Sequence, residues 1–287
     1  MDEFGAAVGA RCWDWLERQR GAFEPFREDD PARARRLLAY GELTGILGGC
    51  LRRGASGGAV ERLARFVDGG LDAYDWEAQA IRSPAFVVAV LVAARFRTAL
   101  GGDAEPLRAA AARHAALGTV DALELAPYRM FELEHLLAAC GAGAGRERTF
   151  AERLRAALAP LGKPPSAYTT HDRYAVTHIV FALCDDGTRA AESVAPAAVV
   201  ARLRDLVALC GRMALIEREH DLLAESVSCV RYLGMDEPRF VREAFALAAA
   251  AQDADGSIPT FAEPPAVEDA RFFQRYHATL MWAHAAT

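Results

Sequence analysis

Four ionisable side chains, Glu132, His178, Glu225 and His277, occupy matching positions in four apolar segments of the sequence. The first three each lie nine residues before a glycine, and successive members are 46, 47 and 52 residues apart. Ionisable groups are costly to bury without partners or a use, so their recurrence predicts a shared site. Imidazoles and carboxylates can give and take protons near neutral pH, which predicts general acid–base chemistry.

Further candidates lie one or two helical turns from these four positions, on the same helix faces. Asp221 precedes Glu225 by four residues, and either carboxylate is expected to act as the base. His178 and His277 are expected to act as the acid or to bind an anion. Glu132 completes the predicted catalytic set. The expected substrate-binding side chains are Tyr174, His171, Tyr128, Glu42, Arg82, Tyr276 and Trp282.

Other polar residues of the same segments fall off the aligned face. Arg129, Glu134 and His135 are interpreted as solvent or inter-helix contacts. Asp185 and Asp186, in the sequence CDDG, either cap a helix, bind a ligand at the mouth of the site, or simply end the helix.

The segments that carry these residues are expected to be helices. Strand signals are nearly absent, and apolar residues recur at the i, i+3, i+4 and i+7 spacing between Gly, Pro and Asp breaks. Helices that are apolar on most faces are predicted at 33–53, 77–99, 126–140, 171–186, 219–233 and 272–285. Amphipathic helices rich in Arg and Glu alternate with them, at 6–23, 58–72, 105–117, 147–160, 195–213 and 237–251.

This alternation predicts a single all-α domain over residues 1–287. Helices that are apolar all round are buried, whereas amphipathic ones face water. Six such antiparallel outer–inner pairs predict an (α/α)6 toroid with a central cavity. An open solenoid would need polar capping repeats, and the last segment, RFFQRYHATLMWAHAAT, is as apolar as the middle ones.

Composition narrows the function classes. The net charge of −6 argues against nucleic-acid binding, which favours a basic face. The longest apolar run, residues 85–94, is too short to span a bilayer, and the N-terminus lacks a secretory signal, so we expect a cytoplasmic protein without a membrane partner. The six cysteines form no C-x-x-C pair and are expected to be reduced core residues.

Short stretches of the sequence resemble known families. AQDADGSIPTF resembles the Q-x-x-D-G-S turn that precedes inner helices in the terpenoid-cyclase and protein-prenyltransferase type of α/α toroid. YAVTHIVFALCDDG, HDLLAESVSCVRYLG and YHATLMW resemble an uncharacterised bacterial family within that superfamily. The resemblance implies the toroid fold without a settled activity.

Departures from the superfamily's motifs exclude its familiar reactions. The sequence contains no D-x-D-D or D-D-x-x-D motif of terpene synthases, no evident Asp, Cys and His zinc set of prenyltransferases, and no C-H-G stretch of lanthionine cyclases. We therefore expect a different reaction in the predicted cavity.

Three function classes remain open. The first is a small-molecule enzyme of the lyase or cyclase type, in bacterial specialised metabolism, that acts without a cofactor and expels an anionic leaving group. The second is a zinc or iron enzyme with ligands among His171, His178, His220 and His277. The third is a ligand-binding or scaffolding protein; a homodimer, or a heteromer with a pathway partner, is compatible with each. A glycosidase is disfavoured because no paired-carboxylate arrangement is evident.

Overall fold

The computed structural model describes residues 3–25, 30–83, 86–143, 147–261 and 268–287. Within these ranges the regular elements are helices and no strand occurs, so the all-α prediction is confirmed. Residues 87–92, the stretch with the strongest β-branched character, lie in a helix as expected. None of the helices in the described ranges has both the length and the apolar composition needed to cross a bilayer.

The apolar series of predicted helices is present, with shifts at the helix ends and a break inside the segment predicted at 77–99. Its members are α2 (Arg33–Arg52), α5 (Val87–Ala99), α7 (Pro127–Ala139), α9 (Thr170–Cys184), α11 (His220–Tyr232) and α14 (Tyr276–Ala285). The first five are each followed by a glycine with a positive φ, the conformation that commonly ends a helix. Gly141, Gly187 and Gly234 among them are the glycines on which the sequence alignment rested.

The amphipathic series is present as well. It comprises α1 (Glu3–Arg18), α3 (Gly58–Asp72), α6 (Glu105–Ala116), α8 (Glu147–Leu158), α10 (Ala197–Glu217) and α12 (Pro238–Ala251). Two short helices are added, α4 (Trp76–Arg82) and α13 (Glu268–Phe273).

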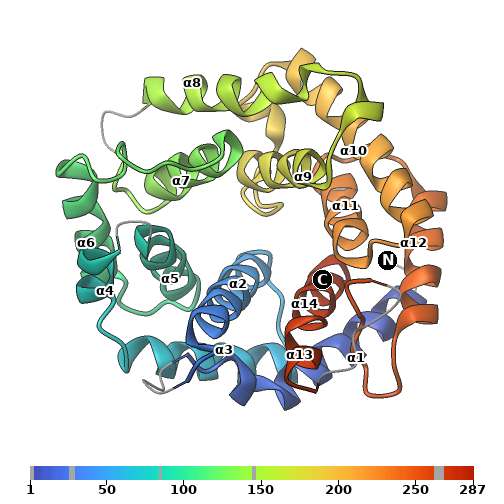
Figure 1. The fold of residues 1–287 in the computed structure, drawn as a ribbon, viewed down its shortest axis with the longest axis horizontal. Coiled ribbons are helices and arrows are strands. Elements are labelled where there is room, and N and C mark those ends of the chain that lie inside the picture. The colour runs from blue at the N-terminus through green and yellow to red at the C-terminus, as the bar shows by residue number, and fades with distance from the viewer. Residues whose placement is uncertain (1–2, 26–29, 84–85, 144–146, 262–267) are drawn as a thin grey trace.

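The two series occupy different positions in the molecule. Each apolar helix contacts the next one in chain order, from α2 to α14, and α14 also contacts α2. Figure 1 shows these helices around the centre of the view, with the amphipathic helices outside them. We refer to the two series below as the inner and outer helices.

The single helix predicted at 77–99 is wrong, because two helices occupy this segment. Helix α4 ends at Arg82, and Ser83 is extended, as is usual for residues near a following proline. Helix α4 contacts α5 and α6, whereas α5 contacts α2 and α7. Only the second half of the segment therefore belongs to the inner series.

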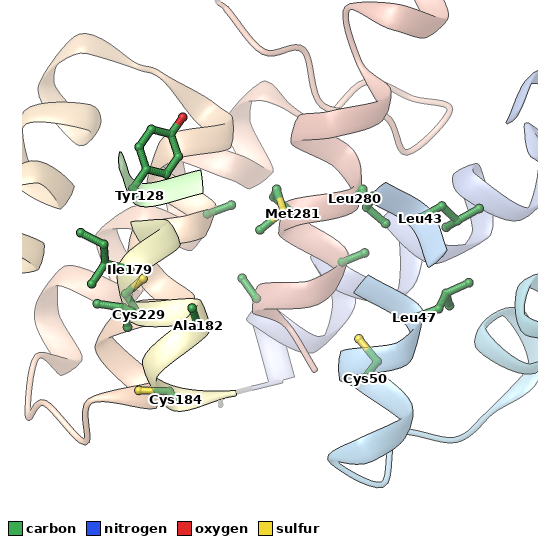
Figure 2. Close-up of a cluster of buried hydrophobic side chains, with 14 of the residues drawn as sticks. Leu43, Leu47, Cys50, Tyr128, Ile179, Ala182, Cys184, Cys229, Leu280 and Met281 are labelled. Carbon is green, nitrogen blue, oxygen red and sulfur yellow. The ribbon is translucent and has the colours of Figure 1, made fainter. Parts of the chain in front are cut away.

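Apolar side chains fill the contacts between inner helices. Figure 2 shows some of them, including Leu47 of α2, Ile179 of α9 and Met281 of α14. All six cysteines are buried and unpaired, which confirms their prediction as core residues. The inner helices are thus held together by a dry core in which a polar group needs a partner on a neighbouring helix.

The connection after α12 fastens the last inner helix to the first outer one. Gln252 donates hydrogen bonds to the backbone oxygens of Val8 (3.2 Å) and Gly256 (3.0 Å), and so bridges α1 and the turn. Ile258 N donates to Thr279 Oγ1 of α14 at 2.9 Å. Gly256 has φ +92°, and a Cβ there would lie 2.5 Å from the backbone oxygen of Arg11.

We expect Gly256→Ala to lower the free energy of unfolding by about 2 kcal/mol or more, since it combines a disfavoured φ with a clash against backbone. Chemical denaturation measures the effect. Gly69→Ala is the matched control: Gly69 lies inside α3 with nothing within 4 Å of the added Cβ, so that change should stabilise the protein slightly. Equal unfolding free energies for both variants would contradict this account of the turn.

Candidate active site

Glu132 of α7 and His178 of α9 form a direct pair. His178 Nδ1 lies 2.5 Å from Glu132 Oε1. Arg129 donates from Nη1 to Glu132 Oε2 at 3.0 Å and lies 3.4 Å from His178 Nδ1. Burial raises the pKa of Glu132, but His178 and Arg129 outweigh it and leave the pKa below its usual value. Glu132 is therefore ionised at neutral pH and fixes the orientation of the imidazole.

Arg129 belongs to this pair, although the sequence pattern set it apart from the aligned face. Arg129 lies three residues before Glu132, about one helical turn away, and its long side chain extends along the helix surface to that carboxylate. Matching positions on aligned helices indicate where each Cβ atom lies, but they do not show how far a long arginine side chain extends.

Asp221 of α11 joins three helices. It accepts a hydrogen bond from the Tyr174 hydroxyl of α9 and another from Leu222 N at 2.9 Å. His277 Nδ1 of α14 lies 3.5 Å from Asp221 Oδ2. Burial raises the pKa of Asp221, but the bonds with His277 and Tyr174 lower it overall. Asp221 is thus an ionised acceptor surrounded by donors.

His277 is correspondingly held in its charged form. Burial alone would lower its pKa, but the hydrogen bond with Asp221 and the nearby charge of Glu42 raise the pKa to about 9. At neutral pH the imidazole is a cation that can donate a proton. Because Asp221 contacts Nδ1, the Nε2–H remains available.

Glu225 differs from Asp221 in the direction of its pKa shift. Burial raises its pKa, and His178 and His277 offset this only in part. Thr177 Oγ1 lies 2.5 Å from Glu225 Oε2 and 3.0 Å from the backbone oxygen of Tyr174. A hydroxyl has one hydrogen, and where Thr177 donates it to Glu225, that bond lowers the pKa of the carboxyl. Burial therefore favours the neutral form of Glu225, whereas the Thr177 hydroxyl and the two imidazoles favour its ionised form.

The four residues singled out by their spacing form one series of neighbours across α7, α9, α11 and α14. Glu132 contacts His178, both His178 and His277 act electrostatically on Glu225, and His277 Nε2 lies 4.0 Å from Glu225 Oε1. The side chains of Glu132, His178 and His277 are 21%, 17% and 26% exposed, whereas Asp221 and Glu225 are 7% and 2% exposed. We call these five residues, with Arg129, Tyr174 and Thr177, the acid–base cluster. The imidazoles are the partly exposed members of this cluster, and the two central carboxyls are its buried members.

Most of the predicted substrate-binding residues lie beside this cluster. The Tyr128 ring packs 5.1 Å from the exposed His171 and 5.5 Å from His178, measured between centroids. Tyr276 lies next to His277, and burial together with a hydrogen bond to Glu42 raises its pKa. The phenol of Tyr276 therefore stays protonated and ties α14 to α2.

Two predicted residues lie elsewhere, and the side chain of a third lies outside the described residues. Trp282 is fully buried, and its ring packs 5.1 Å from Phe245 of the outer helix α12, because it faces away from the inner side of α14. His220 Nδ1 lies 2.7 Å from the backbone oxygen of Pro259, in the connection that follows α12. Arg82 ends α4, and its side chain lies outside the described residues. Trp282 and His220 therefore do not join the acid–base cluster.

The histidines of the metal-site alternative contact different partners. His171 packs on Tyr128, His178 pairs with Glu132, His220 contacts Pro259, and His277 contacts Asp221. In the described part of the chain, no three His, Cys, Asp or Glu side chains form a group that could hold a metal ion.

The sequence argument missed a second polar group, near the C-terminal ends of the inner helices. Arg95 of α5 donates to Asp185, and His135 Nε2 of α7 lies 3.1 Å from the same carboxylate. These three residues line a cavity of about 670 Å³ together with Arg52 and Glu134. Burial raises the pKa of Asp185, but His135 and Arg95 outweigh it and lower the pKa strongly. His135 and Glu134 are buried rather than solvent-facing.

A signal for this group was present in the sequence. Arg95 and His135 each lie six residues before the glycine that follows their helix, and Arg52 and Asp185 each lie two before theirs. The same alignment that selected the acid–base cluster therefore relates these residues as well.

Comparison with known proteins yields one family. The family model described as Domain of unknown function (DUF6895) matches residues 9–287, nearly the whole chain. No curated protein and no solved structure matches the chain.

His277 provides a direct test of the electrostatics of the acid–base cluster. We expect its imidazole to titrate near pH 9 in NMR spectra, above the usual value of about 6.5 for histidine. Asp221→Asn removes its hydrogen-bonded anion and should lower that pKa by about one unit or more. Glu132→Gln is the control, since Glu132 contacts His178 instead. Titration of His277 near 6.5 in the unmodified protein would contradict the assignment.

Proposed function

We propose that this chain, which belongs to the DUF6895 family, is a small-molecule enzyme that transfers protons within an (α/α)6 toroid. The contacts of each inner helix with the next, and of α14 with α2, support the toroid. The position of the outer helices around them in Figure 1 supports it too.

The observation that carries the proposal is the placement of two carboxylate-bound imidazoles beside a buried carboxyl group. His178 and His277 each contact a carboxylate through Nδ1, and Glu225 lies in the field of both. A carboxylate at Nδ1 fixes the ring and leaves Nε2 for proton transfer, as in catalytic triads. Purely structural histidines do not need this duplicated arrangement.

The two imidazoles suit different roles. His277 is cationic at neutral pH and acts as the acid, or stabilises a departing anion through Nε2–H. His178, held by Glu132, accepts a proton at Nε2 from a nucleophile of the substrate. Arg129 adds a fixed positive charge beside His178. Tyr174 orients Asp221 and stays protonated, since burial and Asp221 raise its pKa.

These roles fit a cyclisation or elimination. The base removes a proton from an amine, hydroxyl or activated C–H group of the substrate. The electron pair released forms the new bond, and the leaving group departs as an anion that the cationic groups stabilise. The base gains the proton of the substrate, and the leaving group departs with the electron pair of the broken bond. The scheme therefore requires no oxidant or reductant.

A comparison of variants in a mixture of natural metabolites tests this proposal. Purified protein is incubated with a small-molecule extract of the native cells, and mass spectrometry records which compounds are consumed or formed. We expect at least one conversion, slowed about 100-fold or more in His178→Gln and His277→Gln. Glu243→Gln, on the exposed face of α12, should leave the rate unchanged.

The other outcomes identify the competing functions. A compound that is retained by the protein but never changed would favour the ligand-binding class. A conversion that a chelator abolishes and added zinc or iron restores would favour the metal-dependent class. Equal rates in the histidine variants and in Glu243→Gln would contradict the assignment of the acid–base cluster.

A further inference from the structure

The end of the molecule at which the inner helices terminate carries a concentration of arginine. Arg52 ends α2, Arg53 follows it, Arg95 lies in the last half of α5, and Arg231 lies in the last turn of α11. We call these four residues the arginine group. Within α9, Asp185 follows His178 by seven residues, so this end lies about 10 Å along the helix from the acid–base cluster. The arginine group is thus a separate feature of the molecule.

Three members of the group border one cavity. Arg52, Arg53 and Arg231 line a space of about 530 Å³ with the hydroxyl-bearing residues Thr188, Ser228 and Tyr232. The described residues that line this space include no Asp or Glu. Its walls therefore offer guanidinium and hydroxyl donors to whatever enters.

The nearest carboxylates balance only part of this charge. Arg52 donates to Asp186 Oδ2 at 2.7 Å, and Arg95 donates to Asp185. Burial, followed by the charge of Arg95, lowers the pKa of Arg52, and burial together with Arg53 affects Arg231 in the same way. In the described part of the chain, the four guanidinium groups at this end lie with the carboxylates of Asp185, Asp186 and Glu134.

The pKa of His284 in α14 also reflects the positive charge of the nearby arginines. Burial lowers its pKa, and the charges of Arg53, Arg231 and Arg52 lower it further. The ring is neutral, with Nε2 lying 2.6 Å from the Tyr232 hydroxyl and Nδ1 lying 3.3 Å from Arg53 Nη2.

Capping of helix ends explains part of the arrangement. Arg231 donates to the backbone oxygen of Ala285 at 2.5 Å, and Arg53 donates to that of Asp186 at 2.7 Å. Cations are favourable at the negative ends of helices. Capping does not account for Arg52 Nε, which is buried and finds no hydrogen-bond partner in the described part of the chain. It also leaves unexplained why three guanidinium groups share one cavity whose described lining residues include no Asp or Glu.

We propose that this cavity binds a tetrahedral oxyanion, the phosphate or sulfate group of a small molecule or the free ion. Guanidinium groups match such oxygens with paired, charge-assisted hydrogen bonds. Bound there, the anion neutralises the excess charge and lies within reach of donors from α2 and α11. The cavity volume of about 530 Å³ leaves room for the organic part of a phosphorylated or sulfated compound. The site is independent of the proton transfer proposed above.

Isothermal titration calorimetry at fixed ionic strength tests this proposal, with inorganic phosphate, inorganic sulfate and phenyl phosphate as probes. We expect saturable binding of at least one probe with a dissociation constant in the millimolar range or below. Arg231→Gln and Arg53→Gln should each weaken it about tenfold or more, and Arg231→Lys should weaken it less than Arg231→Gln. Arg239→Gln is the control, because Arg239 lies on the outer helix α12 with an 85% exposed side chain.

The relative affinities of the probes distinguish a bound phosphorylated molecule from a bound free ion. Tighter binding of phenyl phosphate than of inorganic phosphate assigns the cavity to a phosphorylated molecule, and the reverse order assigns it to the free ion. Glu225→Gln should leave binding unchanged, so a failure of the acid–base proposal would not affect this result. If no probe binds, or if folded Arg231→Gln and Arg53→Gln bind as tightly as Arg239→Gln, the proposal is overturned.

Discussion

The contact of Asp221 with Tyr174 and His277 is the interaction on which both the fold and the candidate chemistry depend. It joins α9, α11 and α14, and it places a negative charge on a buried side chain. A buried carboxylate is tolerated only when donors surround it, and here each donor comes from a neighbouring helix or from the adjacent backbone amide. Because Asp221 is ionised, His277 is held as a cation, and burial, with Asp221 adding to it, raises the pKa of Glu225. Helix packing thereby shifts the pKa values of all three groups.

Polar groups are divided between two levels of the inner helices. Glu132, His178 and Glu225 lie nine residues before the glycine that follows their helix, whereas Arg95, His135 and the aspartates of the CDDG turn lie within six residues of theirs. The helix ends carry partial negative charge and attract the guanidinium groups. The outer helices contribute few groups to either level, since their polar side chains face water. One inner surface can therefore hold proton-transferring groups and anion-binding groups without placing them in direct contact.

Much of the fold could be predicted because two periodicities coincide: the helical repeat of the apolar residues, and the longer alternation of apolar with amphipathic helices. The glycine alignment also predicted that Glu132, His178, Glu225 and His277 would be neighbours, and the contacts of Glu132 with His178 and of Glu225 with His277 are of this kind. The predictions that failed concern the direction in which a side chain points and the distance that it can span. Trp282 shares a helix with His277 but faces α12, and Arg129 reaches its partners from a neighbouring face. The helix break near Ser83 depends on a local backbone effect that periodicity does not register.

The protonation state of Glu225 is the most direct test of the account, since it depends at once on burial, on the Thr177 contact and on both imidazoles. Infrared difference spectroscopy at neutral pH, comparing the unmodified protein with Glu225→Gln, detects the C=O stretch of a protonated carboxyl group. We predict a carboxylic acid band that disappears in Glu225→Gln and persists in Glu132→Gln, because Glu132 is ionised. A spectrum in which Glu225→Gln removes only carboxylate bands would show that Glu225 is ionised and would contradict the proposed arrangement of charges.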